Sequence, residues 1–178
     1  MTDNTVIDSA SSIASQLSLD ADTPVESYGG MSSRGVMRYV LGGNSIFTLL
    51  SKSGKRYTYR VRKALPHPRY PKSERMFHVG LLTGPDNLND YNYLGYVELD
   101  DVGHYYTVVL GRKVVLSPAY EGLKYFLKHL RAAITYNSAV PVKGITFIPS
   151  GRCGRCARVL TTPESCQTGF GPECAGKV

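Results

Sequence analysis

The sequence lacks most of the features that identify common enzymes and membrane proteins. No apolar run approaches the ~20 residues that a membrane-spanning helix needs. Walker loops, G-x-G-x-x-G turns, H-E-x-x-H helices and nucleophile elbows are also missing. Because no carboxylate or histidine is spaced so that an acid would lie beside a base, we expect a binding protein rather than an enzyme.

Lysine and arginine are missing from residues 1–26, which hold five acids. A secretory signal needs a basic start and an apolar run, so the sequence predicts a cytoplasmic protein. Residues 1–30 are also rich in Ser, Asp and Thr, which predicts a flexible acidic arm. The rest of the chain carries 21 Lys and Arg against 9 Asp and Glu and would attract polyanions or an acidic protein surface.

Cysteine is absent from the first 152 residues, and all four cysteines lie within the last 26. Cys153, Cys156, Cys166 and Cys174 follow the spacing C-x2-C-x9-C-x7-C. Four thiolates are enough to close a tetrahedral Zn²⁺ site, so we expect a structural, zinc-ribbon-like module over 149–178. Four free thiols, two disulfides and an iron–sulfur cluster are the alternatives.

The residues between the cysteines predict how the ligands are positioned. Thr162 followed by Pro163 and Glu164 is typical of a helix N-terminus, so a one-turn helix should carry Cys166. The segment 169–172, Gly-Phe-Gly-Pro, should then reverse the chain and return Cys174 to the first pair.

Residues 31–148 predict an α+β domain. Ser32 or Ser33 should cap a short helix that Gly42 and Gly43 end. Alternation over 46–63, with a three-residue turn at 52–54, predicts a hairpin that pairs Phe47 with Tyr59. Further strands are expected at 76–82, 93–99, 105–110 and 144–148, and a long helix at 118–136. The predicted fold is a mainly antiparallel sheet of five or six strands with one long packed helix, plus the small C-terminal zinc-binding module.

The hairpin opens the most basic segment of the chain, with nine Lys and Arg between positions 52 and 75 against the single Glu74. We expect its polar face to contact phosphates, with an aromatic ring available to stack on a base. A solvated sheet face is the alternative. The candidate binding residues are Lys52, Lys55, Arg56, Arg60, Arg62, Lys63, Arg69 and Tyr70, together with Arg152, Arg155 and Arg158 around the metal ligands.

The stretch 151–174 resembles the motif GRCGRCxRxLTxPESxxxGxGPxC of a phage- and prophage-associated family of small proteins of unknown function. The pieces FTLLSKSGKRYTYRV and GLLTGPDNLNDYNYLG are similar to the domain that often precedes it. The resemblance implies that the protein comes from a phage or mobile element and therefore acts in the host cytoplasm. It does not indicate what the activity is. Cys153, Cys156 and Cys174 match the motif, whereas Cys166 does not.

A histidine is common just upstream of the family's GRC, but residues 147–150 of this sequence contain none. Either Cys166 takes the vacant ligand place or the metal keeps three protein ligands and an open position. Together these features predict a non-enzymatic, zinc-containing phage-type protein that contacts the nucleic-acid backbone. The alternative is a protein-binding module that inhibits or recruits a host or defence protein.

Overall fold

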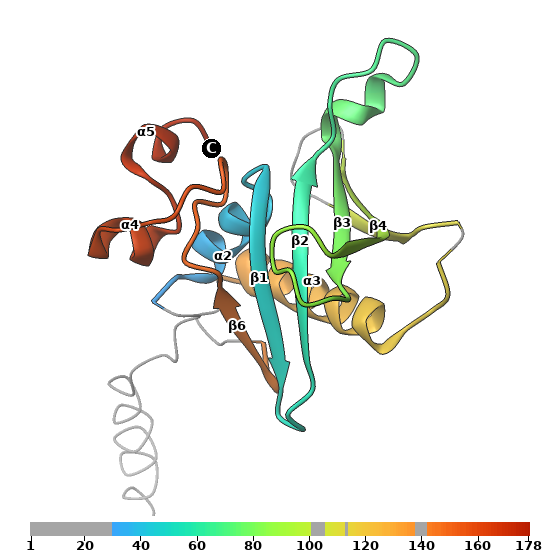
Figure 1. Cartoon of the computed structure of the whole chain (residues 1–178), viewed down its shortest axis with the longest axis horizontal. Helices are drawn as coiled ribbons and strands as arrows, with labels where there is room; N and C mark the ends of the chain where they lie inside the picture. The colour runs from blue at the N-terminus through green and yellow to red at the C-terminus, as the bar shows by residue number, and fades with distance from the viewer. Residues whose placement is uncertain (1–29, 101–105, 113, 138–141) are drawn as a thin grey trace, which may run out of the picture.

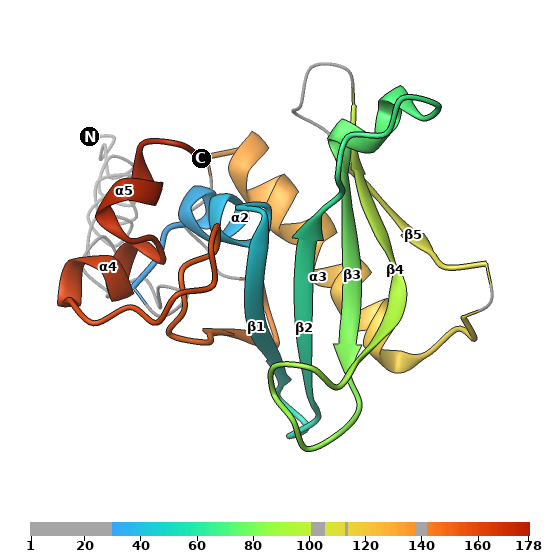
Figure 2. The same cartoon turned by 45° about the horizontal axis from the view of Figure 1, so that its top comes forward.

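The computed structural model describes residues 30–100, 106–112, 114–137 and 142–178. The strands form one antiparallel sheet in the order β5-β4-β3-β2-β1-β6, and α2 and α3 lie against one of its faces (Figures 1 and 2). The elements are α2 (Ser33–Val40), β1 (Asn44–Ser51), β2 (Arg56–Lys63), the 3-10 helix η1 (Pro71–Arg75), β3 (Met76–Leu82), β4 (Tyr91–Leu99), β5 (Tyr106–Leu110), α3 (Pro118–Thr135), β6 (Ile145–Pro149), α4 (Pro163–Thr168) and α5 (Pro172–Ala175). The predicted α+β class is confirmed, whereas the predicted acidic arm lies almost entirely outside the described residues.

The β1–β2 hairpin has the predicted register. Phe47 pairs with Tyr59 and Leu49 with Tyr57. Gly54 adopts φ 79°, and Gly54 N–H donates to Ser51 O at 3.0 Å within the turn. A left-handed residue at this position is what a three-residue hairpin turn requires.

The long helix α3 covers the aromatic face of the sheet. Ser117 caps it by accepting a hydrogen bond from Tyr120 N–H at 3.3 Å, and Pro118 occupies the first turn. Leu123, Phe126, Leu127 and Leu130 are fully buried. Phe126 stacks on Phe147 of β6, with ring centroids 5.8 Å apart.

Two strands differ slightly from the prediction. The strand expected at 93–99 begins at Tyr91, because β4 pairs with β3 as far as Leu82, with a register shift between Val79 and Gly80. The last strand extends over Ile145–Pro149 and pairs with β1. None of the described helices is long and apolar enough to cross a membrane.

Candidate metal centre and basic sheet face

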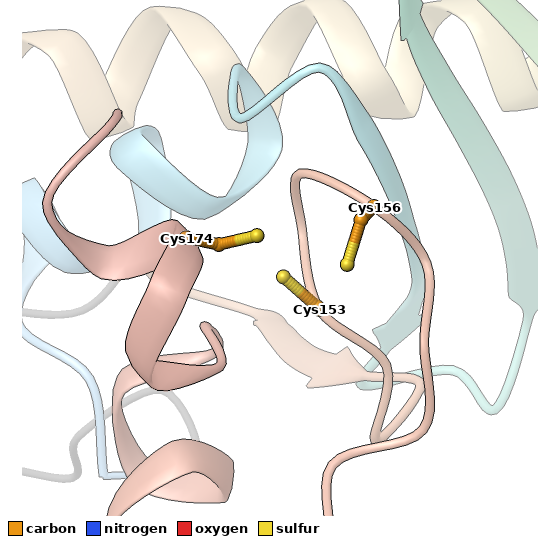
Figure 3. Close-up of side chains that lie close together, drawn as sticks. All are labelled: Cys153, Cys156 and Cys174. Atoms are coloured by element: carbon orange, nitrogen blue, oxygen red, sulfur yellow. The ribbon is translucent and has the colours of Figure 1, made fainter.

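Three of the four cysteines converge in the C-terminal module (Figure 3). The Sγ atoms of Cys153, Cys156 and Cys174 all lie within 4.8 Å of one another. In a tetrahedral zinc site with Zn–S bonds of about 2.3 Å, two sulfurs are about 3.8 Å apart. The three thiols therefore need only small movements to hold one metal ion, and they form a possible metal-binding group.

Two short elements bring these thiols together. Cys153 and Cys156 belong to a turn after β6, here called the knuckle loop (152–159), in which Cys153 N–H donates to Arg158 O at 2.8 Å. Ala157 N–H donates to Cys153 O at 2.8 Å, and Ala157 adopts φ 60° to close the turn. Cys174 lies on α5, to which the chain returns through the predicted reversal at 169–172.

Hydrogen bonds favour the thiolate at one of these cysteines. Burial alone raises the pKa of the Cys153 thiol. Backbone N–H groups of Gly171, Cys156 and Arg155 nevertheless hydrogen-bond its sulfur and hold its pKa at about 7. Burial raises the pKa of Cys174, and the neighbouring Cys156 thiol adds to that increase. Since a thiolate is the form that binds a metal, Cys153 is the best prepared ligand.

Cys166 lies outside this group, in contrast to the prediction that it is the fourth ligand. The one-turn helix α4 forms as expected, with Thr162 Oγ1 accepting from Ser165 N–H at 3.3 Å. Ser165 is the residue that this helix buries, and Cys166, about 100° further round the helix, is exposed. Its Sγ lies 3.7 Å from Leu160 O.

The module shares its core with the sheet. Cys153, Phe170 and Cys174 belong to the same buried cluster as the apolar residues of β1 and α3. Tyr39 of α2 joins the two parts, because its hydroxyl lies 2.9 Å from Ile46 O and 3.1 Å from the carbonyl oxygen of Arg152. Figure 1 shows the module beside α2 and β1.

The helical pattern of the sequence places Val36, Met37, Val40 and Leu41 on one apolar side of α2, and Tyr39 is not among them. Those residues include Met37 and Leu41, which are only partly buried, whereas Tyr39 is completely inaccessible. Its ring makes edge-on contacts with Phe147 and Phe170, at centroid distances of 5.9 and 6.2 Å. The module thus packs on a tyrosine that a short helix supplies.

The sheet face that points away from α3, here called the outer face, carries the arginines of β2. Arg62 pairs with His78 of β3, which pairs in turn with Tyr96 of β4. The β3–β4 connection folds over this face (Figure 2). Beneath it lies a cavity of 270 Å³ lined by two of these arginines, Arg60 and Arg62, by His78 and by Tyr91 and Tyr93.

Arg60 is held in place at the edge of this cavity. Its Nε donates to Asn44 Oδ1 at 3.3 Å, and one of its terminal nitrogens donates to Leu88 O at 2.6 Å. Its guanidinium lies 5.8 Å from the centre of the Tyr91 ring. Partial burial, followed by repulsion from Arg62, lowers the pKa of Arg60, while Tyr91 raises it and Arg152 lowers it further.

The structure gathers some of the predicted binding residues and leaves others apart. A larger open groove of 1100 Å³ adjoins the cavity and shares Arg62 and His78 with it. This groove is lined by three of the candidate binding residues, Lys63, Arg69 and Tyr70, and also by Lys72. Lys52, Lys55 and Arg56 are exposed at the opposite end of the hairpin, and Arg155 and Arg158 are exposed on the knuckle loop, where Arg152 donates to Ala157 O at 3.0 Å.

Sequence reasoning missed the residues of β4 and of the β3–β4 connection. Tyr91 and Tyr93 alternate along β4, a pattern that places them on one face of the sheet. That signal indicates a shared face but not that the face adjoins Arg60.

Comparison with known families assigns only the C-terminal module. Residues 147–178 match a family of unknown function, DUF6011. Searches of curated proteins and of solved structures give no match. The match agrees with the resemblance of the cysteine motif to a family of unknown function, and of the sheet it covers only the end of β6.

Proposed function

We propose that the protein is a non-enzymatic, zinc-containing nucleic-acid-binding protein that contacts the phosphate backbone through its outer face. The observation that carries this proposal is that Arg60 and Arg62 of β2 line one cavity of the outer face, with Arg152 of the knuckle loop near enough to Arg60 to help lower its pKa. The repulsion between such cations is relieved when an anion binds between them. A chain of phosphates supplies such anions at regular spacing.

The groove next to these arginines supports the same proposal. Lys63, Arg69 and Lys72 line it, and Tyr70 is 67% exposed at its edge. Basic side chains along a groove, with aromatic rings between them, are typical of surfaces that follow a nucleic-acid backbone.

The metal would serve structure in this proposal. Cys153, Cys156 and Cys174 would hold Zn²⁺, and a tetrahedral ion with three thiolates keeps one position for water or another donor. The ion would fasten α5 to the knuckle loop, and so fix the position of Arg152. Metal analysis of the purified protein should find one zinc per chain, and protein that contains no zinc would contradict this part of the proposal.

Binding of a labelled oligonucleotide at several salt concentrations tests the backbone contacts. If about five phosphates are neutralised, the slope of log K against log salt should be near −4 to −5 for duplex DNA. The double variant Arg62→Ala, Arg152→Ala should lower the magnitude of that slope by about one to two units and weaken binding to all sequences alike.

The matched control removes the same charge from the opposite side of the protein. Lys124 and Lys128 are exposed on α3, which lies against the other sheet face. Lys124→Ala, Lys128→Ala should therefore bind as the parent does. Equal losses in the two double variants would show that net charge alone attracts the oligonucleotide, and no binding at about 50 mM salt would refute the proposal.

A second candidate function is supported by exposed apolar side chains. Leu65 is 85% exposed in the same groove as Tyr70, where a protein partner could bury both. In this reading a phage-encoded protein would occupy an acidic or nucleic-acid-binding host protein in the host cytoplasm. Capture of one defined protein from nuclease-treated lysate, lost in Leu65→Asp, would favour it over the first candidate.

A further inference from the structure

The cavity of the outer face has a floor of backbone rather than of side chains. Gly80 pairs with Arg60 and lies on the outer face of β3. A Cβ atom at this position would lie 3.0 Å from the Cβ of Tyr91. Tyr91 therefore packs closely on the backbone of Gly80, and both residues line the 270 Å³ cavity together with the arginines of β2 and Tyr93.

Tyr93 forms one wall of the cavity and is held in a fixed position. A Cβ atom on Gly111 would lie 2.8 Å from Cε1 of Tyr93, so the ring rests directly on the backbone of that glycine. The ring of His78 approaches it, with centroids 5.9 Å apart and planes inclined by 60°. Half of the Tyr93 side chain is still exposed, at 50%.

The ring of Tyr91, which also lines the cavity, is already covered. The Arg60 guanidinium covers Tyr91, and the Tyr91 hydroxyl donates to Asn87 O at 3.0 Å. The β3–β4 connection that closes this side is fixed by its own hydrogen bonds, including Leu88 N–H to Asp86 Oδ1 at 2.8 Å. A ligand would thus meet a preformed hollow with cations on one side and the exposed rings of Tyr93 and His78 on the other.

We infer that this cavity receives an unpaired nucleobase, stacked against Tyr93 while Arg62 and Arg60 contact the adjoining phosphates, so that single strands are the preferred ligand. The inference rests on the nucleic-acid-binding function proposed above and specifies its substrate class. Paired bases in a duplex present only their edges, whereas a base of a single strand can leave the stack and offer its face to an aromatic side chain.

Three probes of equal length separate stacking on bases from contact with phosphates. They are a fluorescein-labelled oligothymidylate of about 12 nucleotides, the same chain with abasic sites in place of its bases, and a duplex. Fluorescence anisotropy should show the oligothymidylate binding at least about tenfold more tightly than the abasic chain. The abasic chain carries the same charge, so a difference of this kind comes from the bases.

Variants of Tyr93 test the position of the stacked base. Tyr93→Ala should weaken oligothymidylate binding between about fivefold and a hundredfold and leave the abasic chain unaffected, whereas Tyr93→Phe should keep the parent affinity because the ring remains. Tyr136→Ala, which removes an exposed tyrosine just beyond the end of α3, should also bind as the parent does. Circular dichroism confirms that each variant is folded.

The outcomes distinguish this inference from the proposed function. If the abasic chain and the duplex bind as tightly as the oligothymidylate, the protein grips backbone only, and the inference is wrong while the proposed function stands. The inference also fails if Tyr93→Ala leaves oligothymidylate binding unchanged. If none of the three probes binds at about 50 mM salt, the proposed function fails and the inference fails with it.

Discussion

Replacing Gly154 by alanine tests whether the metal module and the sheet form one cooperative unit. Gly154 lies between the first two cysteines, where the knuckle loop packs on α2. A Cβ atom there would lie 2.8 Å from Tyr39 O, 3.0 Å from the Tyr39 ring and 3.2 Å from the Phe170 ring. None of these atoms lies at the end of a flexible side chain that could move aside, because Tyr39 and Phe170 are both buried.

Overpacking of this kind costs about 1–3 kcal/mol in a well-packed core. We therefore expect Gly154→Ala to lower the free energy of unfolding of the whole protein by that amount. In a chain of this length each kcal/mol lowers the melting temperature by about 2–4 °C. The measurement is thermal and urea unfolding of the zinc-loaded protein, followed by far-UV circular dichroism, which reports on the sheet and on α3.

Gly176→Ala is the matched control. It adds the same methyl group two residues beyond Cys174, where a Cβ atom meets nothing within 4 Å. Its free energy of unfolding should equal that of the parent or be slightly higher, because alanine reduces the conformational freedom of the unfolded chain. The reasoning is refuted if Gly154→Ala weakens zinc binding while the unfolding of the sheet stays unchanged, since the module would then unfold alone.

Three further predictions concern the metal centre and its support. Cys166→Ser should keep the zinc affinity of the parent, whereas Cys174→Ser should lose most of it, as measured by competition with a chromophoric chelator; a large loss in Cys166→Ser would restore the four-thiolate site. Because the pKa of Cys153 is about 7, the metal must displace its proton only below that pH. Zinc affinity should therefore rise with pH, and the slope of log K against pH should be larger below pH 7 than above it by about one. A uniform slope between pH 6 and 8 would contradict this. Tyr39→Phe should lower the free energy of unfolding by about 0.5–1.5 kcal/mol in urea, because a buried and a partly buried carbonyl group lose their contact with the hydroxyl. Unchanged stability would refute that role.

The sequence predicts those parts of the fold that depend on neighbours along the chain. The hairpin register follows from alternating apolar residues and from Gly54, because a shift by one residue would turn every side chain to the other face. The starts of α3 and α4 follow from Ser117 and Thr162, each followed by proline. These signals act over a few residues, so a single sequence contains them.

Contacts between distant segments are not determined in this way. Tyr39 meets Arg152 across a separation of 113 residues, and the helical pattern favours Met37 over Tyr39 as the buried residue. Cysteine spacing counts possible ligands, but it does not show which side of a one-turn helix faces the module. By spacing alone Cys166 is equivalent to the other three cysteines, and only its mismatch to the family motif and its exposed position on α4 set it apart.

A chain of contacts connects the metal centre to the outer face, and it predicts that zinc affects binding without touching the ligand. The Gly154 carbonyl, next to Cys153, accepts a hydrogen bond from Asn44 N–H at 2.8 Å. The side chain of Asn44 in turn accepts one from Arg60 at 3.3 Å. If the knuckle loop loosens when the metal leaves, Arg60 loses one of the contacts that hold it beside the cavity.

Removal of zinc should therefore weaken oligonucleotide binding at constant salt, in protein that circular dichroism shows to be still folded. Asn44→Ala separates this effect from general loosening, because it breaks the link to Arg60 while leaving every thiol and every positive charge in place. It should keep its zinc yet bind the oligonucleotide about as weakly as the metal-free parent does. If metal-free protein and Asn44→Ala both bind as tightly as the zinc-loaded parent, the arginines of the outer face are positioned by the sheet alone, and the metal serves only its own module.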